Sequence, residues 1–137
     1  MIKLIVGKKG SGKTKTLIDL VNAALSSTNG SVVCIEKGNK LNFEINYQCR
    51  LIDTDEYLVT DGQSLYGFIA GILASNHDVT DIFVDSALKI CQNDAASFDV
   101  FLNELEALLK TNDINCVITS SIAVEEASDT VKKFIAE

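Results

Sequence analysis

GKKGSGKT, at residues 7–14, matches the spacing G-x-x-x-x-G-K-S/T without a mismatch and directly follows an apolar run at residues 2–6. Glycines at these places let the backbone curl so that several N–H groups point at one phosphate, and a helix that follows offers the positive end of its dipole. Apolar residues then recur at helical spacing from residue 17 to residue 25. Strand, loop and helix therefore occur in the order that a phosphate-binding loop requires.

This segment, called the glycine loop below, assigns a chemical task to individual side chains. Lys13 is expected to reach the β- and γ-phosphates of a nucleoside triphosphate, and the Thr14 hydroxyl is expected to bind Mg²⁺. The predicted cofactors are ATP and Mg²⁺, with ATP preferred to GTP only by default. The predicted nucleotide contacts are Gly7, Lys8, Lys9, Gly10, Ser11, Gly12, Lys13, Thr14 and Lys15.

Strand-like and helix-like patterns alternate along the rest of the chain. Short apolar runs predict further buried strands at residues 31–36, 81–85 and 115–119. Apolar residues at helical spacing predict helices across residues 65–73, across 98–109 and from about residue 128. The alternation predicts a three-layer α/β/α sandwich with a mainly parallel sheet, formed by one domain over residues 1–137.

The region after the second strand is harder to assign. Residues 41–47 alternate weakly and fit either a strand or an irregular excursion, whereas residues 50–53 resemble a short edge strand. Turn-forming and capping dipeptides mark the nearby element boundaries at Asn29-Gly30, Asp61-Gly62 and Asn93-Asp94.

The composition favours one soluble globular domain. The chain has 137 residues, of which 47% are hydrophobic, without a long uncharged apolar run or a visible targeting segment. We therefore expect no membrane partner and a cytoplasmic location.

The four cysteines form no C-x-x-C pair, and Cys34 and Cys116 lie in predicted strands, so metal and disulfide roles are not expected. His77, the only histidine, falls in a polar turn and is expected to be solvated.

The formal net charge of −7 argues against a generic nucleic-acid surface, because phosphate backbones require clustered Lys and Arg. The local basic cluster belongs to the glycine loop. Arg50 is the only arginine, whereas phosphoryl-transfer enzymes usually neutralise transition-state charge with arginines. We therefore expect slow hydrolysis in an isolated chain. An arginine that neutralises this charge would have to come from a neighbouring subunit or a partner, for instance as Arg50 of another copy. Alternatively, a lysine such as Lys8 would replace it.

Polar residues follow the predicted strands, where ligands of open parallel sheets bind. They are Glu36, Asp85, Thr119, Ser120 and Ser121. Asp85 suits a carboxylate that orients Mg²⁺ through its water shell, although an Asp followed by Ser also fits an ordinary helix cap.

On residues 12–25, which run from the end of the glycine loop through the helix after it, on residues 33–36 and on residues 82–88, the chain resembles the RecA-like branch of the P-loop ATPases. The resemblance implies a P-loop NTPase fold with RecA-like strand order and makes Asp85 the Walker B aspartate. It also implies that Glu36 polarises the attacking water, and that Thr119 or Ser120 senses the γ-phosphate. The family often has glutamine at the sensor position, so Thr119 and Ser120 depart from its pattern.

More distantly, the whole chain looks like short stand-alone ATP-binding proteins of unknown role that often carry a twitching-motility ATPase label. Secretion and retraction ATPases are far longer and have acidic and histidine boxes that this sequence lacks.

A GTPase is disfavoured because the Asn39-Lys40-Leu41-Asn42 stretch lacks the aspartate of N-K-x-D. A small-molecule kinase is disfavoured by the single arginine. A partition-type dimeric ATPase is an alternative: Lys8 stands at its signature position, but Lys9 replaces the glycine that usually follows.

Two classes of function remain. The first is a slow Mg-dependent ATPase in which Lys13 and Glu36 are catalytic and Thr14 and Asp85 hold the metal. The second is a nucleotide-dependent protein-binding module with little hydrolysis. In either case we expect a protein partner or self-association, and no direct contact with nucleic acid.

Overall fold

The computed structural model describes residues 1–135, in which five strands form one sheet with every paired neighbour parallel. The strands follow the spatial order β1-β5-β4-β2-β3. Their bounds are β1 Ile2–Val6, β2 Ser31–Glu36, β3 Arg50–Asp53, β4 Val79–Val84 and β5 Asn115–Ser120. The predicted α/β class with a parallel sheet is confirmed. Residues 50–53 form the predicted edge strand.

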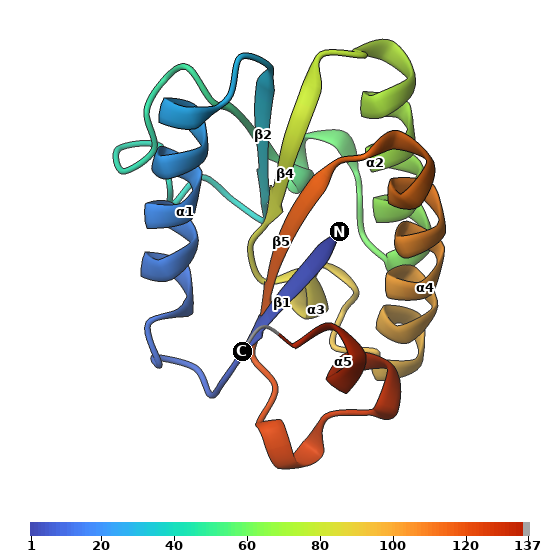
Figure 1. Cartoon of the computed structure of the whole chain (residues 1–137). Helices are drawn as coiled ribbons and strands as arrows, with labels where there is room; N and C mark the ends of the chain where they lie inside the picture. Colours follow the sequence, from blue (N-terminus) through green and yellow to red (C-terminus); the bar gives the residue numbers. More distant parts are fainter. Residues whose placement is uncertain (136–137) are drawn as a thin grey trace.

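Helices cover both faces of this sheet, as a three-layer arrangement requires (Figure 1). α1 lies on one face, and α2 and α4 pack against each other on the opposite face together with α3 and α5. The α-helices are α1 Lys13–Ser27, α2 Gly62–Ser75, α3 Ala87–Ile90, α4 Ala95–Asn112 and α5 Asp129–Phe134. Two 3₁₀ turns complete the elements, η1 Thr54–Tyr57 and η2 Val124–Glu126. No helix among the described residues is both long and apolar enough to cross a bilayer.

Side-chain caps fix where three of these helices begin. The Asp61 carboxylate accepts a hydrogen bond from the Ser64 amide, and the Ser64 hydroxyl accepts one from the Asp61 amide, which completes a capping box for α2. Asp94 caps α4, and Ser128 caps α5. The predicted starts of these helices are therefore confirmed.

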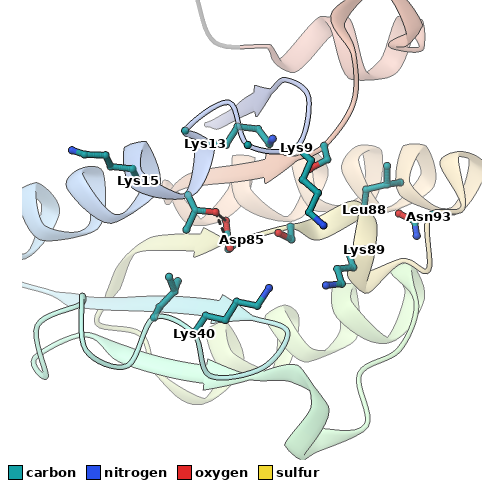
Figure 2. Close-up of a pocket in the computed structure, with 14 residues that line it drawn as sticks. Lys9, Lys13, Lys15, Lys40, Asp85, Leu88, Lys89 and Asn93 are labelled. Carbon is teal, nitrogen blue, oxygen red and sulfur yellow. Dashed lines mark hydrogen bonds between the residues drawn. The ribbon is translucent and has the colours of Figure 1, made fainter.

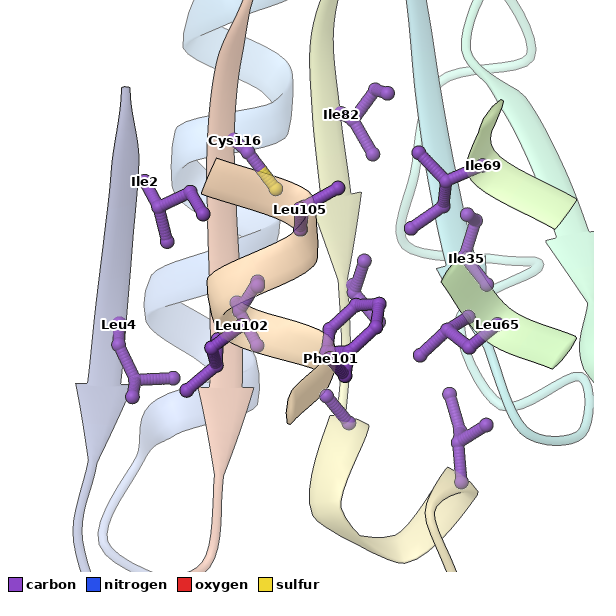
Figure 3. Packing of buried hydrophobic residues seen from close by; sticks show 14 of the residues in the cluster. Ile2, Leu4, Ile35, Leu65, Ile69, Ile82, Phe101, Leu102, Leu105 and Cys116 are labelled. Carbon is purple, nitrogen blue, oxygen red and sulfur yellow. The ribbon is translucent and has the colours of Figure 1, made fainter. Parts of the chain in front are cut away.

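Two apolar clusters hold the layers together, one on each side of the sheet. The larger lies between the sheet and the α2/α4 face, where Phe101, Leu102 and Leu105 are fully buried (Figure 3). The smaller lies under α1 and includes Leu41 and Ile45. Residues 41–47 are therefore the irregular excursion rather than a strand, and they close the edge of the α1 layer.

The strand register brings the predicted polar residues to one edge. Val84 pairs with Ile118 and Val6 pairs with Ser120, so the carboxyl ends of β1, β4 and β5 lie side by side. β4 begins at Val79, two residues before the predicted start, and ends immediately before Asp85. The glycine loop, Asp85 and Thr119 thus meet at the same edge.

Candidate nucleotide-binding site

The glycine loop adopts a conformation that depends on its glycines. Gly10 and Gly12 have φ angles of +85° and +88°, in the left-handed region that favours glycine. Gly12 also begins α1 as its N-cap residue, and no heavy atom lies within 4 Å of a Cβ built at either position. A Cβ on Gly7 would stand 2.6 Å from the Ser11 hydroxyl oxygen, so the loop closes tightly on itself. The space beside its backbone is open for a ligand.

Lys13 lies folded over this loop. Its Nζ donates a hydrogen bond to the Lys8 carbonyl at 2.9 Å and a second, longer one to the Ser11 hydroxyl at 3.5 Å. The residue is buried although it is charged. These contacts hold the ammonium group above the loop backbone, where a β- or γ-phosphate would lie if the loop bound a nucleotide.

Asp85 is the centre of a polar network between strands. The Thr14 hydroxyl donates to its carboxylate at 3.3 Å, and the buried Thr119 hydroxyl donates to its Oδ1 at 2.7 Å. The Thr119 oxygen in turn accepts the Ser86 amide at 2.8 Å, and the Asp85 amide donates to the Ile35 carbonyl at 2.9 Å. Backbone and side chain of Asp85 are therefore both held, and its carboxylate stays beside Thr14.

A cavity of about 710 Å³ opens in front of these residues (Figure 2). From the glycine loop and the start of α1, its lining includes Lys9, Gly10, Gly12, Lys13, Thr14 and Lys15. The facing walls include Lys40, Leu41, Asp85, Leu88, Lys89 and Asn93. This space, called the loop cavity below, lies within the size range of small-molecule and cofactor sites, about 300–1,000 Å³.

The oxygen atoms near Thr14 fit Mg²⁺ better than a transition metal. Within residues 1–135, no group of three or more His, Cys, Asp or Glu side chains could hold a metal ion. Mg²⁺ is usually held by one or two carboxylates together with substrate phosphates and water. The Thr14 hydroxyl and the Asp85 carboxylate supply such a partial set, so water or phosphate oxygens would complete the coordination of a divalent ion there.

Glu36 does not line the loop cavity; it lines a smaller cavity beside β3. Its carboxylate accepts the Lys40 and Leu41 amides, both at 3.1 Å, and the residue is only 2% exposed. Burial raises the pKa of this carboxyl, the two amides oppose that shift, and the nearby Asp85 and Asp53 charges add to it. The side chain therefore anchors the segment that carries Lys40 and Leu41. A catalytic role for Glu36 stays a prediction.

The remaining predicted residues occupy several places. Thr119 and Ser120 are buried, and the Ser120 hydroxyl accepts the Leu88 amide at 3.4 Å, so both hydroxyls engage the segment after β4. Lys8 contributes its carbonyl to Lys13. Arg50 lines a separate, smaller cavity beside β3. A sensor role for Thr119 or Ser120 stays a prediction.

Several residues of the loop cavity were not expected from the sequence. Lys40 lies in the irregular segment after β2, Lys89 lies in the one-turn helix α3, and Asn93 follows it. A lysine in a turn or in a short helix carries no motif of its own. The one available signal was position, since these segments follow strand ends at which ligands of parallel sheets bind.

No protein-family model matches the chain, and a search of curated proteins gave no match.

Proposed function

We propose that this chain binds a Mg²⁺–nucleoside triphosphate, ATP by default, and hydrolyses it slowly. The observation that carries the proposal is the convergence of Lys13, Thr14 and Asp85 on one cavity at the carboxyl edge of the sheet. An ammonium group, a hydroxyl and a carboxylate beside an open glycine loop are the groups that a metal–polyphosphate requires.

The size and lining of the loop cavity favour a nucleotide over a bare phosphate. A volume of about 710 Å³ leaves room beyond a phosphate chain. Leu41 and Leu88 provide apolar surface for a sugar or a base, and Asn93 adds a side-chain donor and acceptor.

We further propose membership of the RecA-like branch of the P-loop ATPases. Three features support it: the glycine loop between β1 and α1, Asp85 directly after β4, and Glu36 at the end of β2. The order β1-β5-β4-β2-β3 is then the RecA-like order of this chain, with β5 between the strand before the loop and the strand before Asp85.

Slow turnover follows from how the polar groups are used. Glu36 is buried, is held by two backbone amides and does not line the loop cavity, so polarising a water there would require the Lys40 segment to move. Arg50 lies outside the loop cavity and does not neutralise charge there within one chain.

A cytoplasmic location fits the proposal, because all four cysteines are free and buried, as in a reducing compartment.

The Lys13→Ala variant tests binding directly. Titration calorimetry with Mg·ATP is expected to show binding to the unchanged chain and none to the variant, while circular dichroism shows that the variant keeps its fold. Lys110→Ala, an exposed lysine outside the loop cavity, serves as the matched control. Undiminished affinity in Lys13→Ala would contradict the proposed site.

A second candidate is a nucleotide-dependent protein-binding module, and the segment after β2 favours it. Phe43 is 100% exposed and Tyr47 is 92% exposed, while Lys40 and Leu41 of the same segment line the loop cavity. A ligand that moves Lys40 would therefore also move two exposed aromatic rings. Aromatic residues are enriched at protein interfaces.

Light scattering with Mg·ATP separates this module from the slow ATPase and from a partition-type dimer. A doubling of mass that Lys8→Ala abolishes would support the partition-type dimer. A change in mass that Phe43→Ser abolishes, with little phosphate release in single-turnover assays, would support the module. Steady phosphate release without association would count against both.

A further inference from the structure

Three lysines that come from different segments meet in the loop cavity. Lys9 belongs to the glycine loop, Lys40 to the segment after β2, and Lys89 to α3. Figure 2 shows their ammonium ends directed into the same region of the cavity, with Lys40 and Lys89 across from Lys13. No single motif unites them, because the fold alone brings them together.

None of these three lysines has a carboxylate partner in the described part of the chain. The ion pairs found there join Lys15 to Asp19, Lys37 to Asp55 and Lys133 to Glu106. The chain carries 19 acidic residues and a net charge of −7, so anionic groups are plentiful elsewhere. Three like charges in one recess repel one another unless an anion lies between them.

The position of this cluster relative to Asp85 indicates which phosphate it would meet. A Mg²⁺ ion at Thr14 and Asp85 would bridge the β- and γ-phosphates. Lys89 follows Asp85 by four residues, and Lys40 lies on the facing wall of the same cavity. Their charges therefore reach the far side of a bound polyphosphate, away from the loop amides.

We infer that Lys9, Lys40 and Lys89 form a second anion site that binds the terminal phosphate of the nucleotide within a single chain. The inference rests on the proposed function and adds to it the residues that distinguish a triphosphate from a diphosphate. Lys40 and Lys89 then supply the positive charge that Arg50 does not deliver to this cavity. A lysine ammonium serves as a point charge for phosphate, whereas arginine adds bidentate geometry.

Calorimetry with Mg·ATP and with Mg·ADP tests the site, using Lys40→Gln, Lys89→Gln and the double variant. Each single variant is expected to lose about tenfold in Mg·ATP affinity, as for one hydrogen bond to a charged group. Mg·ADP affinity is expected to change by less than about twofold. Lys37→Gln is the matched control, because Lys37 lies three residues from Lys40 but bonds to Asp55 outside the loop cavity.

The outcomes separate this inference from the proposed function. Selective loss of Mg·ATP affinity, with Lys89→Arg keeping most of it, supports the lysine site. Equal loss for both nucleotides, or no loss in the double variant, overturns the lysine site and leaves the proposed function standing. An unchanged chain that binds neither nucleotide overturns the proposed function and this inference with it.

Discussion

Replacing Thr119 with valine should destabilise the fold through the Asp85 network. The hydroxyl makes two hydrogen bonds, a 2.7 Å donation to the Asp85 carboxylate and a 2.8 Å acceptance from the Ser86 amide. Valine keeps the shape of threonine, so no cavity forms, but both polar partners lose their bond. Thr119 is only 1% exposed, whereas its partners Asp85 and Ser86 line the loop cavity, where water can replace part of what they lose.

The magnitude follows from these two bonds. A hydrogen bond to a charged group contributes about 1.5–3 kcal/mol, and leaving an amide without a partner costs about 1–3 kcal/mol when it is buried and less at the half-buried Ser86. Because the bonds share one oxygen, their sum is not fully additive, and we expect a loss of about 3 kcal/mol. That is a large share of the roughly 5–15 kcal/mol by which a typical domain is stable.

Urea denaturation followed by circular dichroism measures this loss, with Thr119→Ser as the control. Serine keeps the hydroxyl and removes one methyl group, for an expected cost of about 1 kcal/mol. If valine costs no more than serine, the network does not stabilise the fold and the reasoning is refuted. At low urea, where both variants are folded, valine should also weaken Mg-dependent nucleotide binding more than serine does, because Asp85 loses the bond that orients it.

Three further predictions concern the core, the pH dependence and the thiols. Gly62→Ala should lower the free energy of unfolding by about 1–3 kcal/mol, because the new Cβ would stand 2.7 Å from the Ser97 hydroxyl oxygen. Gly67→Ala on the same helix meets nothing within 4 Å and should raise the free energy of unfolding by about 0.5–1 kcal/mol. Thermal melts of the two variants test this difference. The folded-state pKa of Glu36 is raised from its ordinary value of 4.5, so the folded chain keeps this proton while the unfolded chain loses it, and stability should fall as pH rises from 4.5 to the raised value. Urea titrations across this pH range should show a smaller loss of stability in Glu36→Gln than in the unchanged chain. An identical pH dependence of the two proteins would argue against a buried Glu36 that retains its proton. Burial raises the pKa of Cys116 to about 12, so a thiol reagent at pH 8 should label it only after unfolding, and fast labelling of the folded chain would contradict its burial.

The glycine loop and the buried strands could be predicted because their signals are local. Spacing alone identifies residues 7–14, and continuous apolar runs mark strands with both faces covered. The order of the strands had no such signal, since the four longer strands have similar apolar character. The bond from Thr119 to Asp85 exists only because β4 and β5 are neighbours, so no local pattern of residues predicts it.

The irregular segment after β2 illustrates the opposite case, in which a local pattern leaves two conformations open. Leu41 and Ile45 lie four residues apart, and burial under α1 rather than strand pairing decides their conformation. Glu36 then fixes the segment through the Lys40 and Leu41 amides. Neither the burial nor this carboxylate contact is visible from propensity, because both depend on tertiary packing.

The pairing of β1 with β5 sets the order in which the site can be assembled during translation. Ile2 pairs with Cys116, so the strand that leads into the glycine loop has its partner strand near the opposite end of the chain. At about 5–20 residues per second, a ribosome needs roughly 5–20 s to make the intervening residues. Such long-range parallel pairing folds slowly. Nascent chains that stop before β5 should therefore carry an unsupported glycine loop, and nucleotide capture should begin only once β5 has emerged.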